Sequence, residues 1–439
     1  MKYIFVILLS VLPLWAEAQE AWTLQRCIEH AKAQNLDLKI QRNNERKSVY
    51  DFRQSKWDLA PSISASSNGS INFKRATDAD YNVSSGTSYN ISYSLGSSIT
   101  LFAGFTKLNT IAAARFAMLA TGEAASLSEI MLEINVSSLF SQTLYQKALA
   151  EVANKRLETS RFEAQRIAAT IETGQMEAVA QNEIDAVVSA NLLEYNKAIN
   201  SYKLLKLQLM QMIELPQGSS FEIDGAEFEL SEPEALALDT DSLYAETCIG
   251  YPLVLQTEYE LEYYRKALNI ARGSHSPIIT ASGGYSSGFY STDTIAGGKP
   301  VPVGTQFNKY LNPSLGASLN IPIFDGKRRT YSTKKSRIDV ENAMFRLENQ
   351  KKQLRKELEE AVLKLHSLQL EYMSARDNLT FAERSFETCR EKYQLGMINT
   401  TDFMNVQNLM SQAAVNLLLA RYSWIVQRMT IDLYTLKRQ

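Results

Sequence analysis

Apolar and small polar residues alternate strictly over one stretch in the first quarter of the chain. From residue 89 to residue 101, the odd positions are mostly large and apolar, whereas the even positions are Asn, Ser, Gly or Thr. A period of two predicts a β-strand with one apolar and one polar face, here over residues 89–102. A tilted strand needs about 9 to 11 residues to cross a bilayer, so this strand is long enough. Alternation is also typical of a half-buried strand in a soluble sandwich.

Three further segments carry strand patterns. They cover residues 61–73, 277–290 and 311–324. Polar loops are expected over residues 75–87 and 291–309. Pro313 and Pro322 lie near the ends of the last strand, where a strand tolerates proline. We therefore predict four strands per chain.

Glycines enclose two long segments with a helical period. The segment between Gly104 and Gly174 contains no proline, and the segment between Gly326 and Gly396 is equally long and also lacks proline. Each segment predicts one helix, which at about 1.5 Å rise per residue would be on the order of 100 Å long. We expect the chain to turn at Gly174 and Gly396 and to return as a second helix, because glycine readily adopts the conformation that ends a helix.

These features recur at nearly constant spacing, which indicates an internal duplication. Phe102 and Gly104 recur as Phe324 and Gly326, both at the same offset along the chain. The expected strand–helix junctions are Pro61, Phe102, Gly104, Pro277, Phe324 and Gly326. The predicted order begins with a signal peptide (1–18) and a first repeat (19–215), which has helices at 22–59 and a helical hairpin at 105–215. An acidic linker (216–242) follows. The second repeat (243–439) has helices at 243–272 and a hairpin at 327–436.

The signal peptide is predicted from Lys2, an apolar run to Trp15 and a small-x-small cleavage motif, Ala16-Glu17-Ala18. A membrane anchor is the alternative, but the apolar run is short for a bilayer span. No later apolar run approaches the length of a membrane-spanning helix. Any membrane passage by the mature chain is therefore expected to use strands.

Charge and motifs exclude several classes of function. The formal net charge of −2 gives no attraction to nucleic acid, and the eight acids of the linker are interpreted as a solvated face. The three cysteines are far apart and predict neither disulfides nor a metal site. The three histidines are isolated, and the chain lacks the common hydrolase and nucleotide-binding motifs. We predict no enzyme activity and no cofactor.

Four strands are too few to form a closed β-barrel in a membrane, because the smallest known barrels have about eight strands. A sheet with open edges is not tolerated in lipid. Several chains must then contribute their strands together. Long helical hairpins would extend such an assembly as a tube, which predicts a conduit. An envelope-spanning structural or adhesive coiled-coil protein is the alternative, although it does not explain the four duplicated strands.

The duplicated plan, with Leu101-Phe102-Ala103-Gly104 and Ile321-Pro322-Ile323-Phe324-Asp325-Gly326 at the junctions, resembles the TolC-type outer-membrane efflux proteins. The resemblance implies a mainly α fold with membrane β-structure, a homotrimer with a twelve-stranded β-barrel in outer-membrane lipid, and a periplasmic α-helical tunnel built from the long hairpins. The acidic linker between the repeats would then be periplasmic. The resemblance also implies two partners. These are a periplasmic adaptor protein and an inner-membrane pump, either a proton-driven pump of the resistance-nodulation (RND) type or an ATP-driven (ABC) exporter.

The same resemblance points to a periplasmic gate at the helix tips. The positions that match the gate of the family are Tyr393, Asp402 and Asn405, where the last is an amide instead of an acid. Ile398 stands where the family has arginine, and Ala180 stands where it has an acid. In a trimer, Asp402 would supply three carboxylates that favour cations at a constriction. It could equally be a surface residue that stabilises a helix start.

Basic residues cluster at the start of the second long helix: Lys327, Arg328, Arg329, Lys334, Lys335 and Arg337. They are interpreted either as a site for anionic lipid headgroups or as a merely solvated face. Aromatic residues near the strand ends are expected to form interfacial girdles: Tyr81, Tyr89, Tyr290, Tyr310, Phe102 and Phe324.

Overall fold

The computed structural model describes residues 21–77, 83–174, 177–216, 218–225, 238–293 and 301–435. The predicted signal peptide, the central part of the acidic linker and Tyr81 lie outside these residues. The described chain is mainly helical and has one antiparallel sheet of four strands, so the predicted fold class is confirmed. By packing, the chain divides into two compact units. The first comprises Met1–Gln41, Ser126–Tyr251 and Gln353–Gln439, and the second comprises Arg42–Ala125 and Pro252–Lys352.

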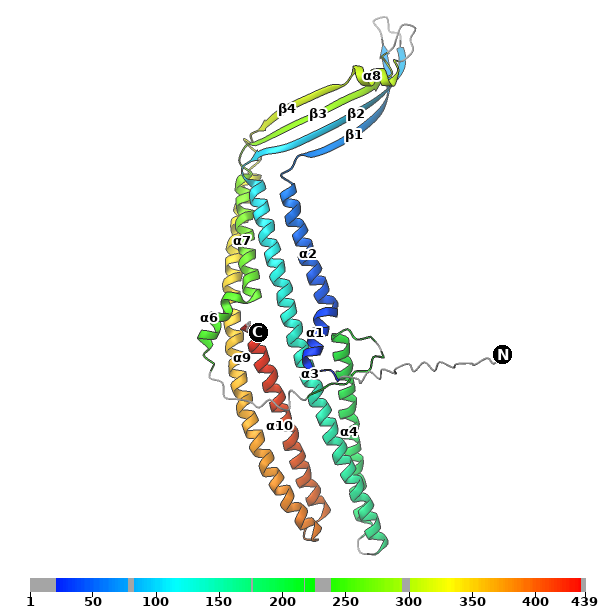
Figure 1. Cartoon of the computed structure of the whole chain (residues 1–439), viewed down its shortest axis with the longest axis vertical. Coiled ribbons are helices and arrows are strands. Elements are labelled where there is room, and N and C mark those ends of the chain that lie inside the picture. Colours follow the sequence, from blue (N-terminus) through cyan, green and yellow to red (C-terminus); the bar gives the residue numbers. More distant parts are fainter. Residues whose placement is uncertain are drawn as a thin grey trace, which may run out of the picture. The chain divides into compact units, whose positions relative to one another are not determined.

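The elements follow each other as two similar series (Figure 1). The first series is α1 (Leu24–Gln34), α2 (Leu36–Trp57), β1 (Ser62–Thr77), β2 (Val83–Ala103), α3 (Thr106–Glu172) and α4 (Val179–Met212). The second series is α6 (Thr240–Gly250), α7 (Pro252–Gly273), β3 (Ile278–Tyr290), α8 (Val303–Lys309), β4 (Asn312–Asn320), α9 (Arg328–Gln394) and α10 (Thr400–Tyr434). Both long helices, α3 and α9, contain 67 residues. Among the described helices, none has an 18-residue stretch apolar enough to cross a membrane.

The sheet has the strand order β1-β2-β3-β4, with each strand antiparallel to its neighbours (Figure 1). Leu95 lies opposite Ala65 on one side and Tyr285 on the other, and Tyr285 lies opposite Pro313. Opposed residues share a face, so most apolar positions of the four strands fall on one side of the sheet. Ile278 and Tyr290 are exceptions, because they lie opposite Asn320 and Asn90 on the other face. The other face carries Ser, Asn, Thr and Gly, including Ser66, whose hydroxyl lies 2.7 Å from that of Ser94.

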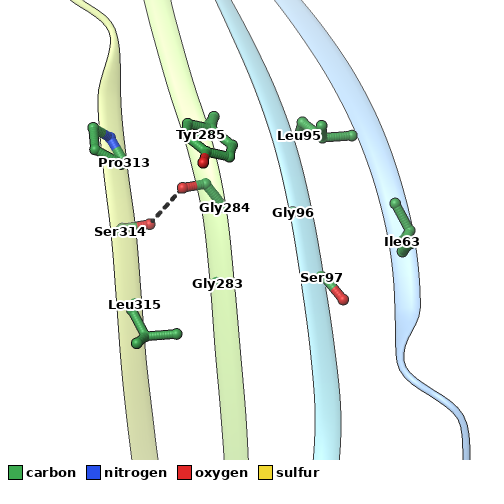
Figure 2. A pocket seen from close by; sticks show the side chains of 10 residues that line it. All are labelled: Ile63, Leu95, Gly96, Ser97, Gly283, Gly284, Tyr285, Pro313, Ser314 and Leu315. Carbon is green, nitrogen blue, oxygen red and sulfur yellow. Dashed lines mark hydrogen bonds between the residues drawn. The ribbon is translucent and has the colours of Figure 1, made fainter.

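A shallow depression lies in the apolar face where glycines replace side chains (Figure 2). The residues drawn there are Ile63, Leu95, Gly96, Ser97, Gly283, Gly284, Tyr285, Pro313, Ser314 and Leu315. A Cβ atom on Gly284 would lie 2.6 Å from the Leu95 carbonyl oxygen. Glycine at this position therefore lets β2 and β3 approach each other closely.

The strand bounds differ from the sequence-based expectations at three places. β1 and β2 remain paired as far as Thr77 and Val83, so most of the loop expected over residues 75–87 is strand. β4 ends at Asn320, before the expected end at 324, because Pro322 has no N–H to donate to a neighbouring strand. The second expected loop, over residues 291–309, contains α8. The buried Gln306 side chain bonds both backbone polar groups of Tyr290 there, which substitutes for a strand neighbour.

The duplication extends to backbone conformation. Gly104 and Phe105 both have φ of 60°, and Gly326 and Lys327 have φ of 68° and 66°. Two successive left-handed residues thus lead the chain from strand to long helix in each repeat. Gly104 also packs closely, since a Cβ atom there would lie 2.3 Å from the Gly273 carbonyl oxygen. Gly326 has open space at the same point.

Candidate functional site

The turn after α9 positions a tyrosine beside the start of α10. The Gly396 N–H donates to the Tyr393 carbonyl oxygen at 3.0 Å, and Gly396 has φ of 72°. Asn399 then caps α10, because its side-chain oxygen accepts a hydrogen bond from the Asp402 N–H at 2.7 Å. This local geometry brings Tyr393 and Thr400 together, with their hydroxyl oxygens 3.1 Å apart.

The Tyr393 hydroxyl also bonds to two residues of α3. It donates a hydrogen bond to the Glu163 carboxylate at 2.7 Å, and the Arg166 guanidinium donates one to the hydroxyl oxygen. The guanidinium carbon lies 4.7 Å from the centre of the Tyr393 ring, in the range of a cation–π contact. One hydroxyl therefore connects α3, α9 and the first turn of α10.

Glu163 and Arg166 form an ion pair of 2.9 Å, in which the Glu163 side chain is only 8% exposed. Burial alone would lower the pKa of Arg166, but the hydrogen bond and charge of Glu163 outweigh it and raise that pKa. Burial raises the pKa of the Tyr393 hydroxyl, and the Glu163 carboxylate adds to this effect. At neutral pH, Tyr393 is therefore a neutral hydrogen-bond donor to a buried, paired carboxylate.

An apolar cluster surrounds this polar contact. The Tyr393 ring stacks on Phe403 with centres 4.4 Å apart and planes inclined by 6°. Phe403, Met404 and Cys389 are buried, and Val187 of α4 packs against them. Within one chain, the helical hairpins α3–α4 and α9–α10 are thus joined near their turns by both polar and apolar contacts. We call Glu163, Arg166, Tyr393, Thr400 and Phe403 the tip cluster.

The other residues expected at the gate have different surroundings. Asp402 and Asn405 are exposed on α10, and among the described residues no hydrogen bond or ion pair involves the Asp402 carboxylate. Ile398, which replaces an arginine of the family, packs against the apolar part of the cluster. Ala180 is half-buried near the start of α4. An apolar contact thus occupies the position where the family pattern has a charge.

Sequence reasoning did not find Glu163 and Arg166. Both precede Gly174 on α3, whereas the family pattern directs attention to positions after that glycine. Glu163 is separated from Tyr393 by 230 residues, so no local pattern could indicate the contact. The only available sign is an opposite-charge pair at helical spacing, and it does not stand out because charged residues are frequent in this stretch of α3.

Hydrogen bonds, one ion pair and aromatic packing hold the tip cluster together. Within the described residues, no three His, Cys, Asp or Glu side chains gather as a potential metal site. The groups of the tip cluster can hold two helical hairpins together or release them.

Residues 243–435 match the family model described as "Outer membrane efflux protein". A curated relative, the outer membrane efflux protein BepC of Brucella suis biovar 1 (strain 1330), is 22% identical over 423 residues, which are 96% of this chain and 86% of the relative. The solved structure of CusC is similar with a TM-score of 0.78 and 17% identity over 94% of this chain and 91% of that one. The Campylobacter jejuni CmeC outer membrane channel has a TM-score of 0.78 and 15% identity over 94% and 85% of the two chains.

Proposed function

The chain belongs to the TolC-like outer membrane efflux protein family and is an efflux channel of the outer membrane, and from this premise we propose how it is assembled and gated. The family consists of channel proteins and not of enzymes. The alternative of a structural or adhesive coiled-coil protein is not favoured. The proposal concerns the number of copies, the partners and the residues of the gate.

We propose a homotrimer because the sheet has two open edges and two chemically different faces. β1 and β4 each have one neighbour in the strand order, and no charged residue occurs in residues 86–103, 278–290 or 312–320. Four strands are too few to close in lipid, whereas three chains contribute twelve. The apolar face then contacts lipid, and the small polar face lines a water-filled passage.

Two measurements on the purified protein test this assembly. Native mass spectrometry in detergent is expected to give three copies of the chain, and planar bilayers are expected to show stable ion conductance. A monomer without conductance would contradict the proposed channel. A conducting oligomer of another number would contradict only the trimer.

The partners are proposed as a periplasmic adaptor and an inner-membrane pump, so that substrates pass from the pump through the helical tunnel to the exterior. Cross-linking in the native envelope, followed by affinity purification of this chain and mass spectrometry, is expected to recover both partners. A proton-driven RND pump would indicate small toxic molecules or metal ions as substrates. An ATP-driven ABC exporter would indicate peptides, proteins or larger metabolites.

We propose that the tip cluster is the latch of the closed gate. It joins α3 to the end of α9 through Glu163 and Tyr393, so the two hairpins of a chain can separate only when these contacts break. Asp402 and Asn405 are proposed to line the constriction, since their exposed side chains are free of the latch. Loss of the latch should therefore open the channel without altering its ion preference.

A further inference from the structure

Exposed aromatic and basic residues gather in the second unit, where the strands pass into the helices. Trp57 is 77% exposed, Phe324 is 82% exposed and Phe105 is 64% exposed. They come from the end of α2 and from the junctions that precede α9 and α3 (Figure 1). Large aromatic side chains in water are unfavourable, and Trp in particular is enriched where a protein passes from lipid to water.

This aromatic group continues the apolar face of the sheet. Leu315 and Leu319 of β4 are 93% and 61% exposed, and Ile323 beyond the strand is 93% exposed. On β2, Leu101 is 61% exposed and leads to Phe105. The apolar side of the sheet, which we propose to contact lipid, therefore continues towards these junctions along β2 and β4.

Positive charge begins where the apolar surface ends. Between Gly326 and Ile338 there are six basic residues and no acid, and between Gly104 and Gly122 there are two basic residues and no acid. Five basic residues of α9 and its junction are exposed, and none of them forms an ion pair with another described residue: Lys327, Arg328, Lys334, Lys335 and Arg337. Arg329 differs, because its guanidinium lies 3.4 Å from the Asp325 carboxylate.

The spacing of these charges fits a headgroup layer. Lys327 and Arg328 follow Phe324 closely, and Lys335 lies only about 12 Å further along the helix. Long basic side chains can bring their charges to a headgroup while their stems cover apolar surface. The ammonium of Lys334 lies 5.8 Å from the Tyr331 ring centre, in the range of a cation–π contact. Phosphates at this level would lie within about one Debye length of several of these charges.

We propose that the exposed basic residues Lys327, Arg328, Lys334 and Lys335, together with Trp57, Phe105 and Phe324 at the boundaries between strands and helices, form a collar that binds the anionic headgroups of phospholipids in the periplasmic leaflet of the outer membrane. The collar rests on the proposed function only for its position at the membrane boundary. Its occupant is a lipid and not a soluble anion, because the charges adjoin an apolar surface that only acyl chains can cover.

The test measures lipid preference in nanodiscs that contain equal amounts of phosphatidylglycerol and phosphatidylcholine. After mild delipidation, native mass spectrometry counts the lipids retained by each assembly. The intact protein should retain about threefold more phosphatidylglycerol than phosphatidylcholine, and the K327Q/R328Q/K334Q/K335Q variant should lose this preference. The matched control is K352Q/K356Q/K364Q/R376Q, which removes the same charge from exposed positions further along α9. This control should keep the preference for phosphatidylglycerol.

The proposal would be overturned if the collar variant kept the same preference for phosphatidylglycerol as the intact protein. It would also be overturned if the control variant lost this preference to the same extent as the collar variant. Salt titration of the intact protein provides a second measurement that needs no variant. The preference should fall at least about twofold between 0.1 and 1 M salt, and a constant preference would contradict headgroup binding. Ion conductance in pure phosphatidylcholine tests the channel separately. A protein that prefers phosphatidylglycerol but does not conduct ions would support the collar and contradict the proposed channel.

Discussion

The hydroxyl of Tyr393 lies 2.7 Å from the carboxylate of Glu163, although the two residues belong to different halves of the internal repeat. The Glu163 side chain is 8% exposed and is held by Arg166 on its other side. A buried carboxylate that loses a hydrogen-bond donor is destabilised by about 1–3 kcal/mol. The contact therefore stabilises the packing of the two hairpins against each other, and the more fully Glu163 is shielded from water, the larger this stabilisation is.

Replacing Tyr393 by Phe tests the latch. The variant keeps the ring that stacks on Phe403 but loses the hydroxyl that bonds Glu163, Arg166 and Thr400. We expect the closed state to lose about 1–3 kcal/mol relative to the open state, seen as a higher open probability in planar bilayers. Tyr263→Phe is the control, because Tyr263 is an exposed residue of α7.

The coupling between the two residues can be isolated with Glu163→Gln and the double variant. If the hydrogen bond is the latch, the effects of the two single changes will not add, because each removes the same contact. Strictly additive effects, or conductance equal to that of Tyr263→Phe, would mean that Tyr393 acts only through packing.

Alkaline pH should weaken the same latch. The pKa of Tyr393 is raised above its ordinary value of 10.0, first by burial and then by the Glu163 carboxylate. Because the folded cluster binds the proton more tightly than an unfolded chain, its stabilisation is complete below about pH 10 and is lost as pH rises through the raised pKa. Open probability should be constant from about pH 6 to 9 and rise above pH 10. A rise of the same size in Tyr393→Phe would assign the effect to another group.

The periodic patterns of the sequence predicted the faces of the sheet and the ends of the long helices. Leu95 and Tyr285 fall on one face because side chains alternate along any strand, and Gly174 ends α3 because few other residues adopt its φ of 73° cheaply. The latch was not predictable in this way. Glu163 meets Tyr393 only after both hairpins have packed, and neither residue carries a local pattern that names the other.

The short helix α8 shows a second limit of sequence patterns. It forms where the buried Gln306 side chain bonds the backbone of Tyr290, a contact that depends on a strand 16 residues earlier in the chain. A polar, glycine-containing segment predicts a loop by composition. Tertiary contacts supply the missing backbone partners and make a helical turn stable there.

The two strand–helix junctions should respond differently to the same substitution. Gly104 and Gly326 both have positive φ, which disfavours alanine by about 1 kcal/mol at each position. At Gly104, the added Cβ would also lie 2.3 Å from the Gly273 carbonyl oxygen and 2.6 Å from Ser276 Cβ, whereas Gly326 has nothing within 4 Å. The Gly104→Ala change should therefore destabilise the protein by about 3 kcal/mol or more, and Gly326→Ala by about 1 kcal/mol.

Urea unfolding followed by circular dichroism in detergent measures this difference. The midpoint should fall clearly for Gly104→Ala and only slightly for Gly326→Ala. Equal shifts would mean that the close approach of Gly104 and Gly273 relaxes at little cost, and that backbone conformation alone sets the requirement for glycine.

Asp402 provides the last test, which concerns the constriction and not the latch. Its backbone N–H bonds to Asn399, but its exposed carboxylate forms no hydrogen bond or ion pair with the described residues, so Asp402→Asn should leave the helix cap in place. In the proposed trimer, three carboxylates at one constriction attract multivalent cations, and their removal should weaken block by hexaamminecobalt about tenfold in bilayer recordings. The control is Asp377→Asn, which removes an exposed carboxylate from α9 and should leave the block by hexaamminecobalt unchanged. If Asp402→Asn leaves the block unchanged, the carboxylate does not line the constriction. Its role would then be to stabilise the start of α10 by interacting with the helix dipole, which contributes at most about 1 kcal/mol.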